Sequence, residues 1–555
     1  METLTSNRLN VHTEESSLLI QQNFQEFRNL VAQAKNYVES GEYTMATVYA
    51  EMAAAYAMVK HCGLFVSPEL ERILVKIAQK TIKSNSYPGR SIPLYKNHRN
   101  VLHVATSASG IGGHSRMIWR WIQQDNGSSH SLVLTRQAPN EIPKALKEAV
   151  INSSGKVLSV LNKGSDDLIS CSQRLREIAA GADLIVLHIS HQDVIPIIAF
   201  ANKEQSAPIL FLNHSDHMFW LGASISDIVI NLRQSGMTLS HTRRGIEAER
   251  NVLLPIILEP TQRTLSRAEA KQQIGIPENS ILLLSIARAP KYRTIDGITF
   301  ADAHLPLLEK YQQAILVVIG PGNGNENWSA AIQKTQGRIR VIPETEDTAV
   351  FYQAADIYVD SFPFSSITSL LEAGSYGSPL VSQYPYPSDA YKILGADAPG
   401  LTDNLLLATD LNDYTEILSN LIADEQFRLS LGERSKATIT NFHTGNNWQR
   451  YLEEIYARSA NIAKINIALN STNDQMFIEE PDVFMLPIYG EDVNLDWYIR
   501  LMPINQRWQH WIKVAKKYNW RKSIILLLPQ WLTIYYKPLK MTFRSFLRLI
   551  LHTMY

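Results

Sequence analysis

Short apolar runs alternate with longer amphipathic segments along the middle of this 555-residue chain. Continuous apolar strands that alternate with helices are typical of parallel sheets covered by helices on both faces. The pattern therefore predicts an α/β fold with two such domains, which divide within residues 255–275. The predicted strands of the first domain are 100–106, 131–135, 183–190 and 208–214, and those of the second are 280–288, 314–320, 339–343, 356–361 and 378–383.

The flanking segments have a different pattern. Residues 14–85 show helical spacing with recurring alanines and a Gly-containing turn. They are similar to one helix–turn–helix unit of the tetratricopeptide kind, but no second copy follows at a fixed period. Residues 442–460 predict a further helix. The predicted segments are an N-terminal helical domain (1–95), an N-terminal Rossmann-like domain (96–262), a C-terminal Rossmann-like domain (263–460), a connector (461–495) and a basic amphipathic tail (496–555).

The composition agrees with a folded protein in a reducing compartment. Hydrophobic residues make up 45% of the chain and charged residues 19%, as in globular proteins. The two cysteines, Cys62 and Cys171, lie far apart, which argues against a disulfide framework. The N-terminus lacks a signal pattern, and no apolar run approaches the length of a membrane span. We therefore expect a cytoplasmic protein.

The formal net charge of zero hides an asymmetry between the tail and the rest of the chain. Residues 497–555 contain eleven Lys or Arg, no Asp or Glu, and five of the ten tryptophans. A basic, Trp-containing amphipathic segment is typical of a helix that lies on an anionic membrane surface. The alternative is a tail packed against the acidic remainder of the protein. Nucleic acid is not expected, because no recognition module accompanies the charge. The basic stripe of the last predicted helix consists of Lys540, Arg544, Arg548 and His552.

Ligands of parallel α/β sheets bind beyond the carboxyl ends of the strands. The first predicted strand runs into Gly110, Gly112 and Gly113, and glycines there let a ligand approach the N–H groups of the next helix. His114 follows, and a histidine at this position is a candidate general base. A structural histidine at a helix start is the alternative.

The fourth predicted strand ends in a polar cluster of His214, Asp216 and His217. The His-x-x-His spacing suggests a metal, but it fits one face of a strand poorly and no further cluster supports it. We expect no metal here. The cluster is either the edge of an acceptor-binding cleft, with Asp216 as a second candidate base, or local packing. The same alternatives stay open for His188, His191 and Asp193 after the third strand.

In the second domain, Arg288 and Lys291 follow the first strand, where fixed cations could bind a diphosphate. Further on, the stretch SFPFSSITSLLEAGSYGSPLV (361–381) enters a helix through hydroxylated residues, with one acid a turn later. Such a helix start can bind phosphate, and the acid can accept hydrogen bonds from a ribose diol. The alternative is a capped core helix. The side chains concerned are Ser365, Ser366, Thr368 and Glu372.

These residues resemble the donor site of a known enzyme group. Two Rossmann-like halves with the donor loop in the second are similar to GT-B glycosyltransferases. The order Phe362-Pro363-Phe364, Thr368, Glu372-Ala373, Gly377 and Pro379 resembles the pattern of the O-linked N-acetylglucosaminyltransferases and the bacterial soluble N-glucosyltransferases. The resemblance implies that the hydroxyls and Lys291 bind diphosphate and that Glu372 binds ribose. His114 resembles the histidine of their Gly-x-His-Pro segment, although Ser115 replaces the proline.

A partial likeness to the retaining GT-B enzymes bears on the stereochemistry of the reaction. Their signature is Glu-x7-Glu, and the segment around Glu372 resembles its second half. The first glutamate would fall at Phe364. This departure favours an inverting mechanism, in which a base deprotonates the acceptor for direct attack on the anomeric carbon.

The resemblance implies a metal-independent glycosyltransferase without a cofactor, using a nucleotide-diphosphate sugar, for which we expect UDP. The expected acceptor is an envelope glycan or lipid-linked glycan at the inner face of a membrane. One alternative is a protein O- or N-glycosyltransferase that docks its acceptor on residues 14–85. A non-catalytic membrane-associated scaffold and a nucleotide-sugar epimerase are the others. The predicted roles are catalytic for His114 and Asp216, donor-binding for Arg288, Lys291, Ser365, Ser366, Thr368 and Glu372, and acceptor-binding for Gly113, His214 and His217.

Overall fold

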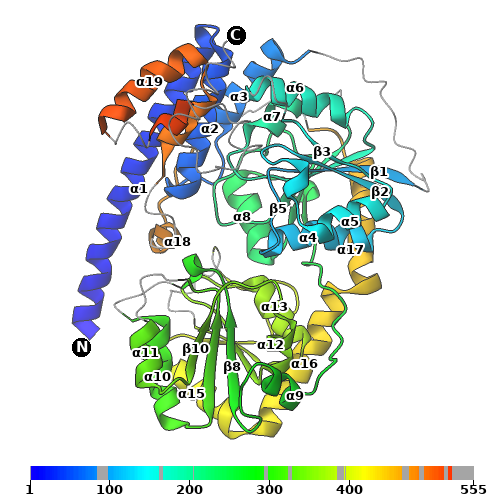
Figure 1. The fold of residues 1–555 in the computed structure, drawn as a ribbon. Coiled ribbons are helices and arrows are strands. Elements are labelled where there is room, and N and C mark those ends of the chain that lie inside the picture. The colour runs from blue at the N-terminus through cyan, green and yellow to red at the C-terminus, as the bar shows by residue number, and fades with distance from the viewer. Residues whose placement is uncertain are drawn as a thin grey trace, which may run out of the picture.

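The computed structural model shows two α/β domains, one above the other, with the N-terminal helices beside the upper one (Figure 1). It describes residues 2–83, 98–161, 167–203, 206–292, 298–322, 328–383, 393, 395–465, 474–486, 493–517 and 523–527.

The upper domain is built on a seven-stranded parallel sheet in the order β3-β2-β1-β4-β5-β6-β7. The change of direction between β1 and β4 places the carboxyl ends of the central strands at one switch point, where ligands bind in such sheets. The strands are β1 (Arg99–Ala105), β2 (Ser128–Leu134), β3 (Val157–Ser159), β4 (Leu184–His188), β5 (Ile209–Asn213), β6 (Ile228–Asn231) and β7 (Asn251–Leu253). The helices are α4 (Gly113–Gln124), α5 (Lys144–Asn152), α6 (Leu168–Ala179), α7 (Val194–Phe200) and α8 (Gln234–Arg244).

The lower domain repeats this plan with a six-stranded parallel sheet in the order β10-β9-β8-β11-β12-β13. The two sheets confirm the predicted α/β architecture of two Rossmann-like domains. The strands are β8 (Ile281–Ile286), β9 (Ala314–Ile319), β10 (Ile339–Ile342), β11 (Ile357–Val359), β12 (Leu380–Gln383) and β13 (Leu405–Ala408). The helices are α9 (Arg267–Gln273), α10 (Phe300–Lys310), α11 (Trp328–Lys334), α12 (Ala349–Ala354), α13 (Ile367–Ser375), α15 (Leu411–Ala423), α16 (Glu425–His443) and α17 (Gly445–Asn461).

Helix α17 returns from the lower domain to the upper one (Figure 1). There Tyr456 accepts a hydrogen bond from the indole of Trp121 at 3.0 Å. The indole of Trp448 donates to the carbonyl of Pro255 in the interdomain segment at 2.7 Å. These buried contacts tie the end of the second domain to the first.

The N-terminal helices α1 (Glu2–Glu39), α2 (Tyr43–Val59) and α3 (Pro68–Thr81) share one apolar core with the upper domain. Small alanines let α2 lie deep between its neighbours, and most of its residues are buried. The buried carboxylate of Glu71 accepts hydrogen bonds from the N–H groups of residues 222–224 at 2.6–3.0 Å. The helices are therefore a packed part of the upper domain's core.

The described part of the C-terminal segment packs on these N-terminal helices (Figure 1). Ile499, Met502, Val514 and Leu526 belong to the shared core. The stripe of Lys540, Arg544, Arg548 and His552 lies outside the described residues. No described helix combines the length and apolar character needed to cross a bilayer. The elements of the segment are α18 (Glu480–Met485), η6 (Leu495–Leu501), α19 (Ile504–Lys517) and η7 (Ile524–Leu527).

Candidate active site

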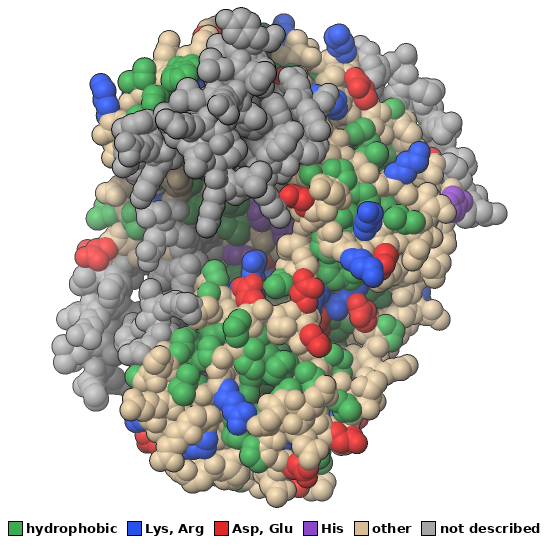
Figure 2. Space-filling view, viewed as in Figure 1, with side chains coloured by type: hydrophobic (Ala, Val, Ile, Leu, Met, Phe, Trp, Pro, Cys, Tyr) green, Lys and Arg blue, Asp and Glu red, His purple; other side chains and the backbone are tan. Residues whose placement is uncertain are grey.

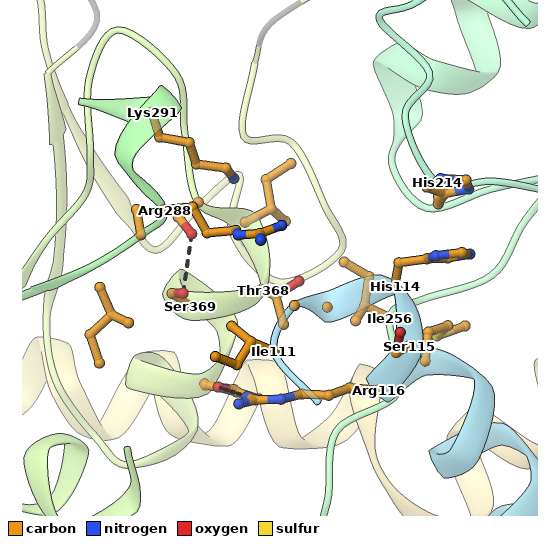
Figure 3. Close-up of a pocket in the computed structure, with 18 of the residues that line it drawn as sticks. Ile111, His114, Ser115, Arg116, His214, Ile256, Arg288, Lys291, Thr368 and Ser369 are labelled. Carbon is orange, nitrogen blue, oxygen red and sulfur yellow. Dashed lines mark hydrogen bonds and ion pairs between the residues drawn. The ribbon is translucent and has the colours of Figure 1, made fainter. Parts of the chain in front are cut away.

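A cavity of about 510 Å³ lies between the two Rossmann-like domains. Figure 2 shows histidine atoms at this waist of the molecule. The cavity is lined by every residue to which the sequence assigned a role, and Figure 3 shows several of them facing one another across the domains. Their individual roles stay predictions. The residues are Gly113, His114, His214, Asp216 and His217 from the first domain and Arg288, Lys291, Ser365, Ser366, Thr368 and Glu372 from the second.

Two helices begin at the cavity without a capping side chain. Gly112, with φ of 115°, precedes α4, and Ser366 precedes α13. The hydroxyl of Ser366 accepts no hydrogen bond from α13 and instead donates to the hydroxyl of Ser369 at 3.1 Å. The capped-helix alternative is therefore wrong for α13. The first N–H groups of both helices, with the positive ends of the helix dipoles, are available to an anion.

The two helix starts approach each other closely. A Cβ atom on Gly113 would lie only 2.5 Å from Oγ1 of Thr368. A larger residue at position 113 would therefore require the Thr368 side chain to shift. The loop after β1 and the start of α13 therefore form two sides of one narrow site.

Lys291 is a partly buried cation of the site that makes no ion pair with a carboxylate of the residues that the structure describes. Its Nζ donates to the carbonyl of Ser365 at 2.8 Å and lies 4.8 Å from the centre of the Phe364 ring. Burial lowers the pKa of Lys291 to about 8. The side chain of Arg288, by contrast, is 63% exposed. Lys291 can therefore hold a phosphate in place, while Arg288 can approach one from the rim.

Asp360, which the sequence analysis missed, holds the loop that carries these groups. It follows β11, and its Oδ1 accepts hydrogen bonds from the N–H groups of Ser361 at 2.9 Å and Ser366 at 2.8 Å. Its Oδ2 accepts the hydroxyl of Ser382 at 3.2 Å. Burial raises the pKa of Asp360 to about 6. The signal for this residue was an acid at the end of an apolar run.

Glu372 is bound by two arginines from the opposite domain. Arg116 Nη1 lies 3.1 Å from both carboxylate oxygens, and Arg120 Nη2 lies 3.0 Å from Oε1. Arg120 also contacts Glu259 of the interdomain segment at 3.2 Å. The sequence analysis missed both arginines, although their spacing places them on one face of α4. The predicted ribose ligand thus takes part in an interdomain ion-pair network.

His114 faces the cavity as a neutral base. Its ring stacks on that of His214, with the centres 3.9 Å apart and the planes at 16°. Burial, and then the neighbouring His214, hold the pKa of His114 well below its usual range. Burial also lowers the pKa of His214 to about 4. Both rings are therefore uncharged at neutral pH and can accept a proton.

Asp216 is engaged by Arg233 in a two-pronged ion pair. Its carboxylate oxygens lie 2.7 Å from Nε and Nη2 of Arg233. Burial alone would raise the pKa of Asp216, but the Arg233 charge and the hydrogen bonds from His217 and Arg233 outweigh it and hold the pKa below its usual range. Arg233 thus occupies both carboxylate oxygens of Asp216, whereas His114 lines the cavity and forms no ion pair among the described residues. On this geometry His114 is better placed than Asp216 to take a proton.

Within the described residues, no group of three or more His, Cys, Asp or Glu side chains is placed to hold a metal ion. His214 and His217 instead contact neighbouring rings. His214 stacks on His114, and the centre of the His217 ring lies 4.8 Å from that of Phe364.

No protein-family model and no curated protein sequence matches the chain. Several solved structures are similar in fold. HepE of Anabaena, solved with UDP and glucose, is 14% identical over 66% of this chain and 100% of its own, with a TM-score of 0.49. An O-GlcNAc transferase mutant of Thermobaculum terrenum is 14% identical over 81% of this chain and 83% of its own, with a TM-score of 0.46. A UDP-GlcNAc 2-epimerase of Neisseria meningitidis, bound to UDP-GlcNAc, is 14% identical over 64% and 99%, with a TM-score of 0.44.

Proposed function

We propose that this protein is a glycosyltransferase that moves a sugar from a nucleotide-diphosphate donor to an acceptor in the interdomain cavity. The observation that carries the proposal is the convergence of two uncapped helix starts and the partly buried Lys291 on one cavity. N–H groups and a fixed ammonium are suited to a diphosphate, whose negative charge grows as it leaves the sugar.

The remaining residues fit the other parts of such a reaction. The carboxylate of Glu372 is suited to a ribose diol, and neutral His114 to the proton of an acceptor hydroxyl. A bound diphosphate would favour the charged form of His114 and so raise its pKa toward neutrality. Position 364 holds a phenylalanine, so no carboxylate stands at the place a retaining enzyme would use. We therefore propose direct, inverting attack without a metal.

A panel of nucleotide sugars tests donor binding directly. A ligand that binds the folded state raises its melting temperature by mass action, so we expect one nucleotide sugar to stabilise the protein and Lys291→Ala to remove the shift. Lys310→Ala, at an exposed position of the same domain, is the matched control and should keep the shift. The binding donor is then incubated with glycan and lipid extracts.

The products decide between the alternatives. A glycosylated acceptor supports transfer. Binding without turnover would favour a scaffold, and an isomerised free sugar would favour an epimerase. A donor panel that leaves the melting temperature unchanged would contradict the proposal.

We also propose that the acceptor is an envelope or lipid-linked glycan at an anionic membrane surface. Ile504, Trp508 and Ile512 recur every four residues along α19 and are exposed by 60%, 49% and 50%. The last turn of α19 adds two lysines, and tryptophan beside basic residues is typical of membrane interfaces. Replacing the three apolar residues by serine should abolish sedimentation with anionic vesicles. Unchanged sedimentation would contradict the role of α19.

A further inference from the structure

Three histidines lie in a diagonal line across the central strands of the upper sheet. His130 is on β2, His103 on β1 and His188 on β4, and these strands are neighbours. The register pairs Val101 with His130 and Ala105 with His188. His103 lies two residues from each of these β1 positions, so the three side chains share one face of the sheet. All three are fully buried. We call them the histidine file.

Hydrogen bonds join the rings of the histidine file end to end. His103 Nδ1 lies 2.9 Å from His188 Nε2, and His103 Nε2 lies 2.9 Å from His130 Nδ1. His130 Nε2 in turn lies 3.3 Å from Oδ2 of Asp125, the residue after α4, and 3.3 Å from the main-chain carbonyl oxygen of the same residue. Tyr456 donates its hydroxyl to Oδ2 of Asp125 at 2.8 Å. The file therefore ends on a buried carboxylate.

Asp125 sets the direction of every hydrogen bond in the file. Burial alone would raise the pKa of Asp125, but the neighbouring His130 and the hydrogen bond from Tyr456 outweigh it and lower the pKa, so the group is a carboxylate that only accepts hydrogen bonds. A neutral His130 carries its proton on Nε2, toward Asp125, and accepts at Nδ1. Burial holds the pKa values of His103 and His188 well below the usual range, so each carries one proton. Because His130 accepts at Nδ1, His103 donates to it from Nε2 and accepts at its own Nδ1. His188 therefore donates to His103 from Nε2.

The other end of the file points toward the candidate base. In the described part of the chain, the buried atoms His188 Nδ1 and His114 Nε2 have no hydrogen-bond partner. The two ring centres are 6.1 Å apart, compared with 5.1 and 5.2 Å in the hydrogen-bonded pairs of the file. A proton on His114 Nε2 would match the lone pair on His188 Nδ1. A small approach of the two rings would thus extend the file to the cavity.

We propose that the histidine file is a proton relay that serves His114 during sugar transfer, an inference that rests on the proposed function. His114 Nδ1 takes the acceptor's hydroxyl proton as that oxygen bonds to the anomeric carbon and the carbon's bond to the diphosphate breaks. His114 Nε2 then passes its own proton to His188 Nδ1. Each later ring accepts at Nδ1 and donates from Nε2, and Asp125 receives the last proton. Every imidazole ends neutral in its other tautomer.

The relay answers a difficulty of the site. The surroundings of His114 disfavour a positive charge, because the ring is buried and stacked on another imidazole. A proton that remained there would form an imidazolium in this environment. A proton passed inward leaves His114 neutral and removes the negative charge of the buried Asp125, and burial favours the neutral form of a carboxyl group.

The substitution His103→Gln distinguishes a role in proton transfer from a purely structural role of the ring. The amide of glutamine can still donate and accept a hydrogen bond, but it does not readily pass a proton from one side to the other. We expect the transfer rate to fall at least tenfold, since general-base assistance contributes about 10²–10⁴-fold, and donor affinity to stay within about twofold of wild type because no donor contact changes. His304→Gln is the matched control. His304 is fully buried in the lower domain and bonded through both ring nitrogens, but lies outside the file.

Nitrogen-15 NMR of histidine-labelled full-length protein provides a second readout, independent of turnover. We expect all three rings of the file to be neutral and protonated at Nε2. A proton on His188 Nδ1, or a wild-type transfer rate in His103→Gln, would overturn the relay while leaving sugar transfer intact. A wild-type protein that transfers sugar from no donor would overturn the relay together with the proposed function.

Discussion

At the scale of single residues, Glu372 is both a proposed ligand of the ribose and an ion-pair partner of Arg116 and Arg120. One substitution distinguishes these two roles. Glu372→Ala removes an acceptor for the ribose diol, and a hydrogen bond to a charged group contributes about 1.5–3 kcal/mol. We expect the affinity for the donor to fall about 10–100-fold. Pyrophosphate, which lacks ribose, should bind at least as well as before, because the substitution removes a negative charge. Calorimetry with both ligands makes the comparison. Equal losses for both would show that Glu372 acts by positioning α4.

Lys291 predicts a pH dependence of donor binding. Burial lowers its pKa to about 8, so the unliganded protein loses this positive charge as the pH rises through that value. Because a diphosphate favours the charged form, we expect donor affinity to be full below pH 8 and to weaken above it. Lys291→Arg keeps the charge throughout this range, so its affinity should stay level. Calorimetry on both proteins across the transition is the measurement, and an equal slope in both would assign the titration to another group.

The residues of the site were predictable one by one, but their partners were not. His114 and Lys291 follow apolar strands, and the switch-point rule places such residues at one edge of the sheet. The pairing of Glu372 with Arg116 depends on how the two domains meet, which no local pattern encodes. The ion pair of Asp216 with Arg233 likewise depends on tertiary packing. Two members of the histidine file, His103 and His188, lie within predicted apolar strands, whereas His130 lies between two serines just before its predicted strand, so no sequence pattern joined the three.

At the scale of elements, the close approach of α4 to α13 predicts the effect of Gly113→Ala. Alanine is the better helix former, so a helix alone would gain stability. Its Cβ, however, would lie 2.5 Å from Oγ1 of Thr368. Overpacking of this kind typically costs about 1–3 kcal/mol, and we expect that loss in urea unfolding. Adding Thr368→Ala, which removes the opposing atom, should recover most of it. A Gly113→Ala protein as stable as wild type would show that the Thr368 side chain or the domain that carries it yields without cost.

The strands were predicted best where they lie inside the sheets. All nine predicted strands are present, whereas the structure adds β3, β6, β7 and β13. Three of these lie at sheet edges, and two of the three, β3 and β7, are only three residues long. The edge strand β13 (Leu405–Ala408) and the fully buried β6 (Ile228–Asn231) are apolar enough to have been recognised. A hydroxylated helix start was ambiguous for a different reason, because capping and anion binding use the same residue types.

At the scale of the whole molecule, contacts between the two ends of the chain could not be predicted from sequence. The Tyr49 hydroxyl lies 3.3 Å from His510 Nε2, and Glu42 accepts a hydrogen bond from Gln506 at 2.5 Å. Local patterns identified the N-terminal helices and the basic tail separately. That the two segments lie together is a property of the shared core with the upper domain. The described part of the tail is therefore a structural element of the protein as well as the carrier of an exposed apolar ridge on α19.

Because the described part of the tail contributes to the shared core, we expect two truncations of the tail to differ in stability. A chain that ends at residue 492 loses the buried side chains of Ile499, Met502, Val514 and Leu526. Because burial of one large aliphatic side chain contributes about 1.5–3 kcal/mol, and such estimates are upper bounds, we expect unfolding to require about 4–8 kcal/mol less free energy. A chain that ends at residue 527 keeps all four contacts and should retain its stability in the same urea titration. The donor groups around Lys291 lie in the other domain, so the shorter chain should still bind the nucleotide sugar under native conditions. Equal stability of the two chains would show that the C-terminal segment packs on the helices without supporting them.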